Sequence, residues 1–458
     1  MSQLKSWLQS QHASGLSLSM EEFSDGETKL PVHVAPESSV DQDLAEVAEA
    51  ELKQDEIKRD CDVLVEGQTA MEAYMDLLAE ASENGGISAQ TASFMRVGLE
   101  RYESLFGMDE GLTPANEAFG GTGSRQQATE VSLEAIKEVL DRGWEAVKAA
   151  FKALVNAMKD LYARITNAGG KLEKRANELK AKAKSMSGAR QTQDKITISG
   201  AAKLFADGQW AGDDVAMMKG FLGESLERFP EAVVKYAMNA ATEINKFKPE
   251  NESADAAIKA ILKLDGIVGA LKTKSVTDGR FGKNVDVKRG EIMPGNMALY
   301  ISEPTGSGDE IEQLSRLHSG LRADFLAVTD AKAGPKDYEL PVESLDKLAA
   351  RADQIAKCAQ MLKNPKFDQK KVDTAVNTLI QSGDNLKKHM ASVELTAEQK
   401  KRGDALLRGT VAIQRMLGGT INGLMSYSAR TLNAQLVVIE RQLAAYGAPK
   451  DAPRLAKD

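Results

Sequence analysis

The residues best suited to acid–base or metal chemistry are few and isolated in this sequence. The four histidines among the 458 residues are His12, His33, His318 and His389. None of them has another histidine or a cysteine at the spacing of a metal site, and no His-Glu-x-x-His motif occurs. We therefore expect no metal site and no bound cofactor, and we interpret each histidine as a surface or packing residue.

The two cysteines are poor candidates for covalent chemistry. Cys61 lies between Asp60 and Asp62, whose negative charges disfavour the reactive thiolate. Cys358 lies far from it in the sequence, so the pair forms no disulfide framework and indicates a reducing compartment. The sequence also contains no Gly-x-Ser-x-Gly elbow and no phosphate loop ending in Gly-Lys-Ser/Thr. These patterns predict a protein that is not an enzyme and has no catalytic residue.

Basic residues gather in one short segment that could contact phosphate groups, because lysine and arginine supply most of the non-specific affinity for nucleic acid. The candidate contacts are Lys171, Lys174, Arg175, Lys180, Lys182 and Lys184. Glu173 and Glu178 are interleaved with them, so a solvated helix face is the alternative interpretation. No aromatic residues alternate with the basic ones, and we therefore expect no sequence-specific reading of bases.

The strongest signal is the uneven distribution of charge along the chain. Residues 1–117 contain 24 acidic and 7 basic residues, a net charge of −17. The remaining residues contain 43 acidic and 52 basic residues, a net charge of +9, so the overall charge of −8 is the sum of two opposite parts. An acidic leader on a basic body indicates an anionic partner for the body. The alternative is an acidic tail that only keeps the protein soluble.

The composition favours helices over sheets, with 5% aromatic residues and 12 prolines. We expect residues 1–40 to be mostly disordered and residues 40–105 to be helical in two segments. Six glycines and prolines between residues 107 and 123 predict an exposed linker. No stretch reaches the roughly 18 uncharged apolar residues of a membrane span. The start of the chain lacks the apolar core of a signal peptide.

A coiled-coil pattern follows the linker. Apolar residues alternate at spacings of four and three, which is the seam that a helix presents to a partner helix. The seam consists of Leu140, Trp144, Val147, Phe151, Leu154, Met158, Leu161 and Ile165. Asn167-Ala168-Gly169-Gly170 then predicts a helix end, and a second helix is expected from Lys171 to about Met186. Residues 118–190 are therefore predicted to form a basic, coiled-coil-like helical hairpin.

Residues 191–458 are predicted to form a helical body with a small α+β insertion near residues 274–342. Short strands are expected at 285–287, 297–301, 325–328 and 338–342, and residues 195–199 could join them. Thr396 and Gln399 form a capping box for a long last helix that ends near Tyr446. Gly418, Gly419 and Gly423 within it predict close helix packing. The predicted fold class is mainly α: a helical bundle with coiled-coil hairpins, a small α+β insertion and a disordered acidic N-terminus.

The junction between the acidic and basic parts carries a specific resemblance. Ala115-Asn116-Glu117, followed by Ala118-Phe119-Gly120-Gly121, resembles the maturation sites of head proteins in large tailed bacteriophages. In that family a prohead protease cuts after a glutamate that has a small or aliphatic residue two positions earlier. The helical, alanine- and lysine-rich body is similar to the internal head proteins of giant phages. The resemblance implies a processing site at Ala115, Asn116, Glu117 and Ala118.

The resemblance also implies a location and a set of partners. It implies a structural protein whose acidic propeptide (residues 1–117) is removed in maturation and whose body is packaged in the capsid interior with the genome. The protein would occupy the host cytoplasm during assembly, and its ejection into a new host is left open. The implied partners are the prohead protease, other capsid or core proteins and, non-specifically, DNA. No membrane contact is expected.

Other cut sites and other functions stay open at this point. Four further triplets fit the same cutting rule: Leu44-Ala45-Glu46, Leu78-Ala79-Glu80, Ala128-Thr129-Glu130 and Ser132-Leu133-Glu134. Glu117 is preferred because its glycine- and proline-rich flanks can adopt the extended form that a protease binds. The main rival function is a cytoplasmic coiled-coil adaptor or scaffold with the leader as a permanent acidic tail. A third is an α-helical toxin whose glycine-rich last helix inserts into a membrane.

Overall fold

The computed structural model describes most of the chain after residue 38. The described residues are 39–88, 90–91, 95–99, 102, 125–251, 257, 261–263, 265–269, 271–305 and 320–447. His12, His33, His318 and the predicted processing site at Ala115–Ala118 lie outside them, as do the whole predicted linker and residues 1–38 of the predicted disordered N-terminus; its last two residues, 39 and 40, are helical.

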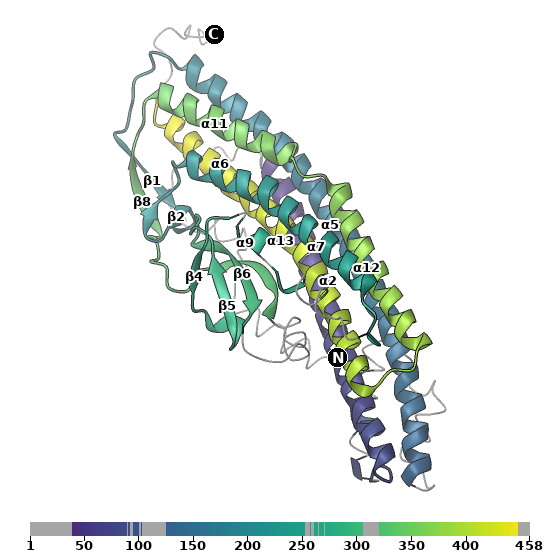
Figure 1. Ribbon diagram of the computed structural model, residues 1–458. Helices are drawn as coiled ribbons and strands as arrows, with labels where there is room; N and C mark the ends of the chain where they lie inside the picture. The colour runs from purple at the N-terminus through teal and green to yellow at the C-terminus, as the bar shows by residue number, and fades with distance from the viewer. Residues whose placement is uncertain are drawn as a thin grey trace, which may run out of the picture.

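Long helices form an elongated body with the strands on one side (Figure 1). The α-helices are α2 (Ser39–Glu83), α5 (Arg125–Ser185), α6 (Val215–Gly223), α7 (Phe229–Lys246), α9 (Asp265–Val268), α11 (Leu345–Lys363), α12 (Gln369–Ser392) and α13 (Ala397–Ala444). A π-helical turn, η3 (Glu224–Arg228), joins α6 to α7, and two 3-10 turns are η2 (Ala201–Leu204) and η4 (Gly279–Phe281). The mainly α fold class is confirmed.

The last helix, α13, is the central element of the body. It contacts α2, α5, α6, α7, α11 and α12, and its apolar residues are buried along most of its length. It begins at the predicted capping box, in which the Thr396 hydroxyl accepts from the Gln399 backbone and the Gln399 side chain accepts from the Thr396 backbone. Satisfying these end groups at a fixed residue sets where this buried helix starts.

The predicted hairpin over residues 118–190 is wrong, because α5 is one continuous helix of 61 residues. Asn167-Ala168-Gly169-Gly170 lies in its interior and does not end it. A Cβ atom on Gly169 would lie 2.8 Å from the backbone nitrogen of Lys363 and 3.2 Å from the carbonyl oxygen of Ala359, both in α11. The glycine is therefore required by the close approach of two helices and not by a turn.

The heptad seam is buried as predicted, but it faces several helices and not one coiled-coil partner. All eight seam residues have less than a tenth of their surface exposed. The buried pattern continues beyond the glycines through Ala168, Leu172, Ala176, Leu179 and Ala183. Helix α5 contacts α2, α11 and α13 along this surface, so the seam forms part of the common core.

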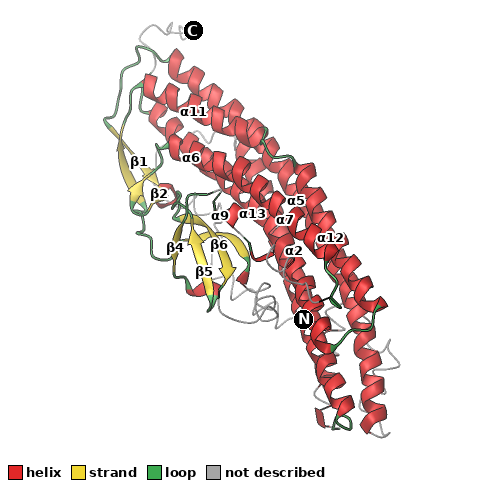
Figure 2. Ribbon diagram, viewed as in Figure 1, coloured by secondary structure: helices red, strands yellow, loops and turns green. Residues whose placement is uncertain are grey.

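The predicted strands are present in two of the three small sheets that the described residues form (Figure 2). The four-stranded antiparallel sheet has the order β4 (Lys274–Val276), β5 (Val285–Arg289), β6 (Met297–Pro304), β7 (Arg322–Ala327). Strand β1 (Lys195–Ser199) pairs with β8 (Asp337–Pro341) in a separate sheet, and β2 (Phe205–Ala206) pairs with β3 (Gln209–Trp210). The segment at 195–199 thus pairs with the last predicted strand and does not extend the larger sheet.

Each face of the four-stranded sheet has its own apolar core. Leu299, Ile301 and Phe325 face the helices, and Phe325 packs against Tyr427 of α13 with ring centroids 4.7 Å apart. On the opposite face, Tyr300 stacks on Phe281 at 5.5 Å within a smaller cluster. The alternation of side chains along β6 produces this division, since successive residues point to opposite faces.

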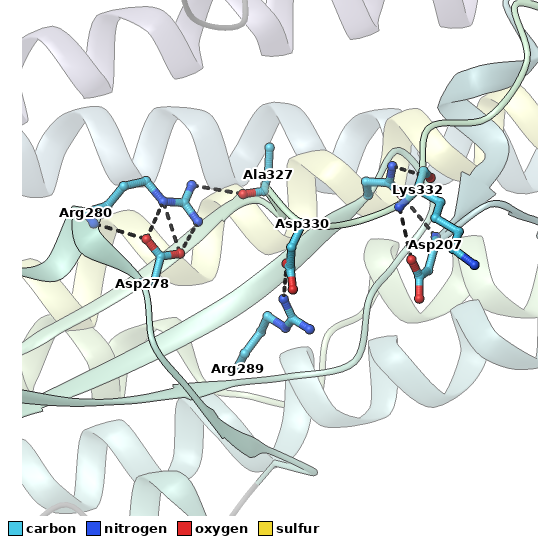
Figure 3. Close-up of polar contacts among 8 residues, drawn as sticks. Asp207, Asp278, Arg280, Arg289, Ala327, Asp330 and Lys332 are labelled. Atoms are coloured by element: carbon cyan, nitrogen blue, oxygen red, sulfur yellow. Dashed lines mark hydrogen bonds and ion pairs between the residues drawn. The ribbon is translucent and has the colours of Figure 1, made fainter.

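Polar contacts hold the turns around the outer face of this sheet (Figure 3). The Arg280 guanidinium donates to the Asp278 carboxylate, and its Nη1 also donates to the carbonyl oxygen of Ala327 at 2.9 Å. The mostly buried Arg289 donates to Asp330 at 2.8 Å. These contacts connect the ends of β5 and β7 to neighbouring turns, and we interpret them as structural.

Gly169→Ala should destabilise the protein, because the new methyl group would meet backbone atoms of α11 that cannot move without shifting the helix. A cost on the order of 1–3 kcal/mol is expected for such overpacking. Gly170→Ala is the matched control: its Cβ would lie 3.8 Å from the flexible side chain of Lys363. Here we expect a gain of up to about 1 kcal/mol from helix propensity. Urea unfolding of both variants tests this, and similar effects in both would contradict the close approach.

Candidate functional site at the seat of the acidic leader helix

The acidic leader contributes a long helix to the core of the body. Helix α2 carries fourteen acidic and three basic residues, and it runs beside α5 and α13. The prediction of a helical segment after residue 40 is confirmed for Ser39–Glu83. We call the surface of α5, α13 and β7 that α2 covers the leader seat. The division of the chain at residue 117 stays a prediction, but α2 itself packs as part of the body.

On α5, three basic side chains of the leader seat meet carboxylates of α2. Arg164 pairs with Glu46 at 3.1 Å, Lys171 pairs with Asp43 at 2.6 Å, and Arg175 approaches Asp41 at 3.9 Å. The basic residues are separated by seven and four positions, so they lie on one face of the helix. The matching acids follow one another along the first turns of α2. Opposite charges therefore align the two helices over this stretch.

On α13, two arginines and one asparagine complete the leader seat. Arg430 pairs with Glu51 at 2.7 Å, and Arg408 pairs with Glu72 at 2.6 Å. Between them, the amide nitrogen of Asn422 donates to the buried Gln54 side chain at 3.1 Å and to the carbonyl oxygen of Met158 at 2.9 Å. One pair has the reverse sign, since Lys58 of α2 lies 3.5 Å from Asp324 of β7.

Apolar packing accompanies these polar contacts. The buried apolar residues of α2 are Val40, Leu44, Val47, Ala50, Cys61, Val65, Met71 and Leu78. Gly419 of α13 faces α2, where an added Cβ would lie 3.7 Å from Cδ of Lys58. This is an ordinary van der Waals distance, and an added Cβ on Gly423 would meet nothing within 4 Å, so neither glycine is required by a close approach of helices. A hydrophobic surface of this size ties the leader helix to the body independently of charge.

The structure divides the six basic residues predicted to contact phosphate. Lys171 pairs with Asp43 of α2, Arg175 pairs with Glu440 of α13 at 2.7 Å and approaches Asp41 of α2, and Lys180 pairs with Asp353 of α11 at 2.6 Å. Lys174, Lys182 and Lys184 are exposed, and Lys174 lies 4.0 Å from Glu178. Three of the six basic residues thus pair with other elements of the protein, and the other three are exposed to solvent.

Sequence reasoning missed three basic residues of the leader seat. Arg164 could have been found, because it lies one heptad before Lys171 on the same face of α5. Arg408 and Arg430 gave no signal, because their acidic partners are more than 300 positions away in the sequence. Only the fold brings these charges together.

The remaining sequence candidates do not form a second site. His389 lies 2.9 Å from the Glu250 carboxylate, as an ordinary polar contact between α12 and a neighbouring turn. Across the described ranges, no group of histidine, cysteine and acidic side chains is arranged to hold a metal ion. Within the same ranges, no helix is both long and apolar enough to cross a membrane.

A cluster of three acidic residues lies at the far end of the leader seat. Burial raises the pKa of Glu72 to about 8; the charge of Asp404 adds to this shift, Arg408 opposes it, and Asp76 adds further. Burial also raises the pKa of Asp404 to about 6, with Lys400 and Arg408 opposing, Asp76 adding and Lys387 of α12 opposing. Both carboxyl groups therefore hold their protons more tightly in the folded protein than in the unfolded chain.

This cluster predicts a pH-dependent stability. Because the two pKa values are raised on folding, their contribution is favourable below the unfolded values and is lost as the pH rises through about 6 and about 8. Glu72→Gln should flatten the fall in the free energy of unfolding between about pH 5 and about pH 8. Glu80→Gln, at an exposed position of α2, is the control. An unchanged slope in Glu72→Gln, measured by urea unfolding across this range, would contradict the assignment.

The chain matches a known protein family. A family model described as phiKZ-like phage internal head proteins matches residues 42–441. The match begins in α2 and ends in α13, so it includes the leader helix together with the body that it covers. No curated protein and no solved structure matches the chain. Because the family model covers most of the sequence, the chain belongs to the phiKZ-like phage internal head proteins.

Proposed function

We propose that this structural protein of the phage head interior is made with residues 1–117 as a leader, is cut after Glu117 by the prohead protease, and is packaged with the genome. It acts without catalysis and without a cofactor. Other capsid or core proteins are its partners during assembly, and DNA is a non-specific partner after maturation. Ejection with the genome is compatible with this role but is not needed for it.

The observation that carries the proposal is the pairing of charge across the leader seat. Carboxyl groups of α2 lie within 4 Å of five basic side chains of the body: Arg164, Lys171, Arg175, Arg408 and Arg430. Loss of residues 1–117 would change the net charge from −8 to +9 and would remove the partners of Lys171, Arg408 and Arg430, whereas Arg164 and Arg175 would keep Asp160 and Glu440 of the body. A head interior filled with DNA favours proteins that do not repel phosphate. The leader thus keeps cationic side chains of the body, Lys171 and Arg430 above all, neutralised until processing.

The secondary structure supports Glu117 over the other candidate cut sites. Glu46 and Glu80 lie within α2, and Glu130 and Glu134 lie within α5. A protease binds its substrate in an extended form, so residues inside a stable helix are protected. Glu117 lies outside the described residues, in a segment rich in glycine and proline.

Cleavage after Glu117 would not by itself release the leader. It would break one peptide bond but none of the contacts of α2 with α5 and α13. Release therefore needs further cuts within 1–117 or displacement of α2 by another binding partner. A processed protein that still holds its leader helix would be an intermediate of this pathway.

The rival functions receive less support. An adaptor that pairs through the heptad seam would need that surface free, but Val147 and Leu154 are 1% and 3% exposed within the body. A toxin that inserts its last helix would need to extract α13, which contacts six other helices. The family match also favours the head interior over both.

The processing proposal predicts the composition of the protein in particles. Intact mass and N-terminal sequencing of the protein from purified phage should give a chain that begins at Ala118. The same measurement on infected cells before head maturation is the control and should give the full-length chain. A packaged chain that keeps residues 1–117 covalently attached would overturn the processing step. A cut at a different glutamate would retain processing but move its site.

The DNA proposal predicts a salt-dependent affinity that grows on processing. Protein from particles should bind duplex DNA more tightly than the unprocessed protein, and its affinity should fall more steeply with salt. Replacing Lys174, Lys182 and Lys184 by glutamine should reduce the salt slope by up to about 3, since each phosphate contact contributes about 0.9. Replacing the exposed Lys370, Lys371 and Lys401 is the matched control. Equal losses in the two variants would contradict a contact at 174–184.

A further inference from the structure

The side of α2 that faces away from the body carries exposed apolar residues. Among the described residues, the large hydrophobic side chains with high exposure are Leu52 (63%), Val63 (41%), Leu77 (54%) and Val97 (66%). Three of the four belong to α2. They are separated by 11 and 14 positions, which correspond to about three and about four helical turns. They therefore lie in one line, and we call Leu52, Val63 and Leu77 the outer stripe.

The outer stripe follows a heptad pattern on the face opposite the leader seat. Taking Leu52 as position d of a heptad places Val63 and Leu77 at position a, with Ala70 and Ala73 at core positions between them. The stripe extends over about 37 Å of helix. The buried residues of α2, such as Cys61, point the other way into the core. One helix thus has two faces with apolar residues, of which the body covers one.

Acidic residues interrupt and border the outer stripe. Glu49, Glu56, Asp60 and Glu66 are exposed and lie within a quarter turn of its apolar members, and the exposed Arg59 is the one basic residue on the line of the stripe, between Leu52 and Val63. Partial burial and, next, the negative charge of Glu56 raise the pKa of Asp60, and the positive charge of Arg59 opposes this shift only in part. A partner for this face must therefore offer apolar side chains opposite the stripe and positive charge beside them.

We propose that the outer stripe of α2 binds a basic amphipathic helix of another protein in the head interior. A helix with apolar core positions and lysine or arginine beside them matches the stripe in shape and in charge. The partner's basic residues would pair with Glu56 and Glu66, while Leu52, Val63 and Leu77 would lose their contact with water. The leader would then connect two proteins, since one face of α2 is held by the body and the other by the partner.

Charge argues against the other possible occupants. A second copy of α2 would bring two rows of carboxylates together, because the helix carries fourteen acidic residues against three basic ones. Residues 1–38 of the same chain contain five acidic and two basic residues, so they do not complement the face either. DNA and anionic lipid carry the same sign of charge as the carboxylates beside the stripe. The inference concerns the intact leader, and it holds whether or not residues 1–117 are later removed.

The test uses the full-length chain and two synthetic peptides of four heptads. The first peptide has leucine at its core positions and lysine at the flanking positions, and the second has glutamate in place of every lysine. Fluorescence anisotropy of the labelled peptides should show binding of the basic peptide only. This binding should weaken as salt is added, because part of it is electrostatic.

Variants of the full-length chain locate the binding. Replacing Leu52, Val63 and Leu77 by glutamine should weaken binding of the basic peptide about tenfold or more, since apolar anchors dominate such interfaces. The matched control replaces Val97 and Ala79, which are also exposed, by glutamine and should leave binding unchanged. Circular dichroism checks that each variant is folded. Glu56→Gln with Glu66→Gln should reduce the salt dependence.

Four results would overturn the proposal. They are a lack of binding of the basic peptide to the full-length chain, equal binding of the acidic peptide, unchanged binding in the triple variant, and a dimer of the full-length chain that the triple variant abolishes. The last result would show that a second copy covers the stripe. None of them bears on cleavage after Glu117, which the mass of the packaged protein tests separately.

Discussion

The contact between α2 and the body governs how the two oppositely charged parts of the chain behave as one protein. Its ion pairs differ in exposure: both partners of Arg164–Glu46 are 40% or more exposed, whereas Glu72 and Arg408 are 12% and 15% exposed. Exposed pairs contribute about 0–1 kcal/mol, so the pairs near solvent mainly set alignment. The apolar residues of α2, such as Val47 and Leu44, supply most of the stabilisation. High salt alone should therefore not detach the leader.

Helix α13 contacts both α2 and the four-stranded sheet. Its Tyr427 hydroxyl donates to the carbonyl oxygen of Pro294, and its Thr420 hydroxyl donates to that of Ala323 in β7. The same helix holds α2 through Arg408, Asn422 and Arg430. The sheet and the leader helix thus both pack against the buried helix α13. Buried polar groups of this kind are favourable only when they find their partners, which fixes where each element docks.

A helix with two apolar faces suits an assembly protein. The inner face of α2 makes the leader part of the folded body, while the outer stripe leaves it able to contact a second protein. Surface apolar residues scattered singly need no explanation, but a line of them along one helix presents a seam. Removal of the leader would then change two properties together: the exposed positive charge of the body and its attachment to a partner.

The sequence by itself determined the local features. The heptad spacing identified the buried face of α5, Thr396 and Gln399 marked the start of α13, and short segments between glycine and proline turns located strands of the insertion. The division of charge at residue 117 likewise follows from the order of the residues alone. Each of these features depends on residues that are close in sequence, so periodicity and capping chemistry report them directly.

Only the tertiary structure decided how these features combine. Gly169 has the local signature of a helix end, but the backbone of α11 would lie 2.8 Å from a Cβ at this position, so no larger residue fits. The acidic segment has the composition of a tail, but Arg408 and Arg430, more than 300 positions later, meet its carboxylates. Sequence patterns give the chemical preference of each segment, but the partner that satisfies it is chosen by long-range packing, which no local spacing encodes.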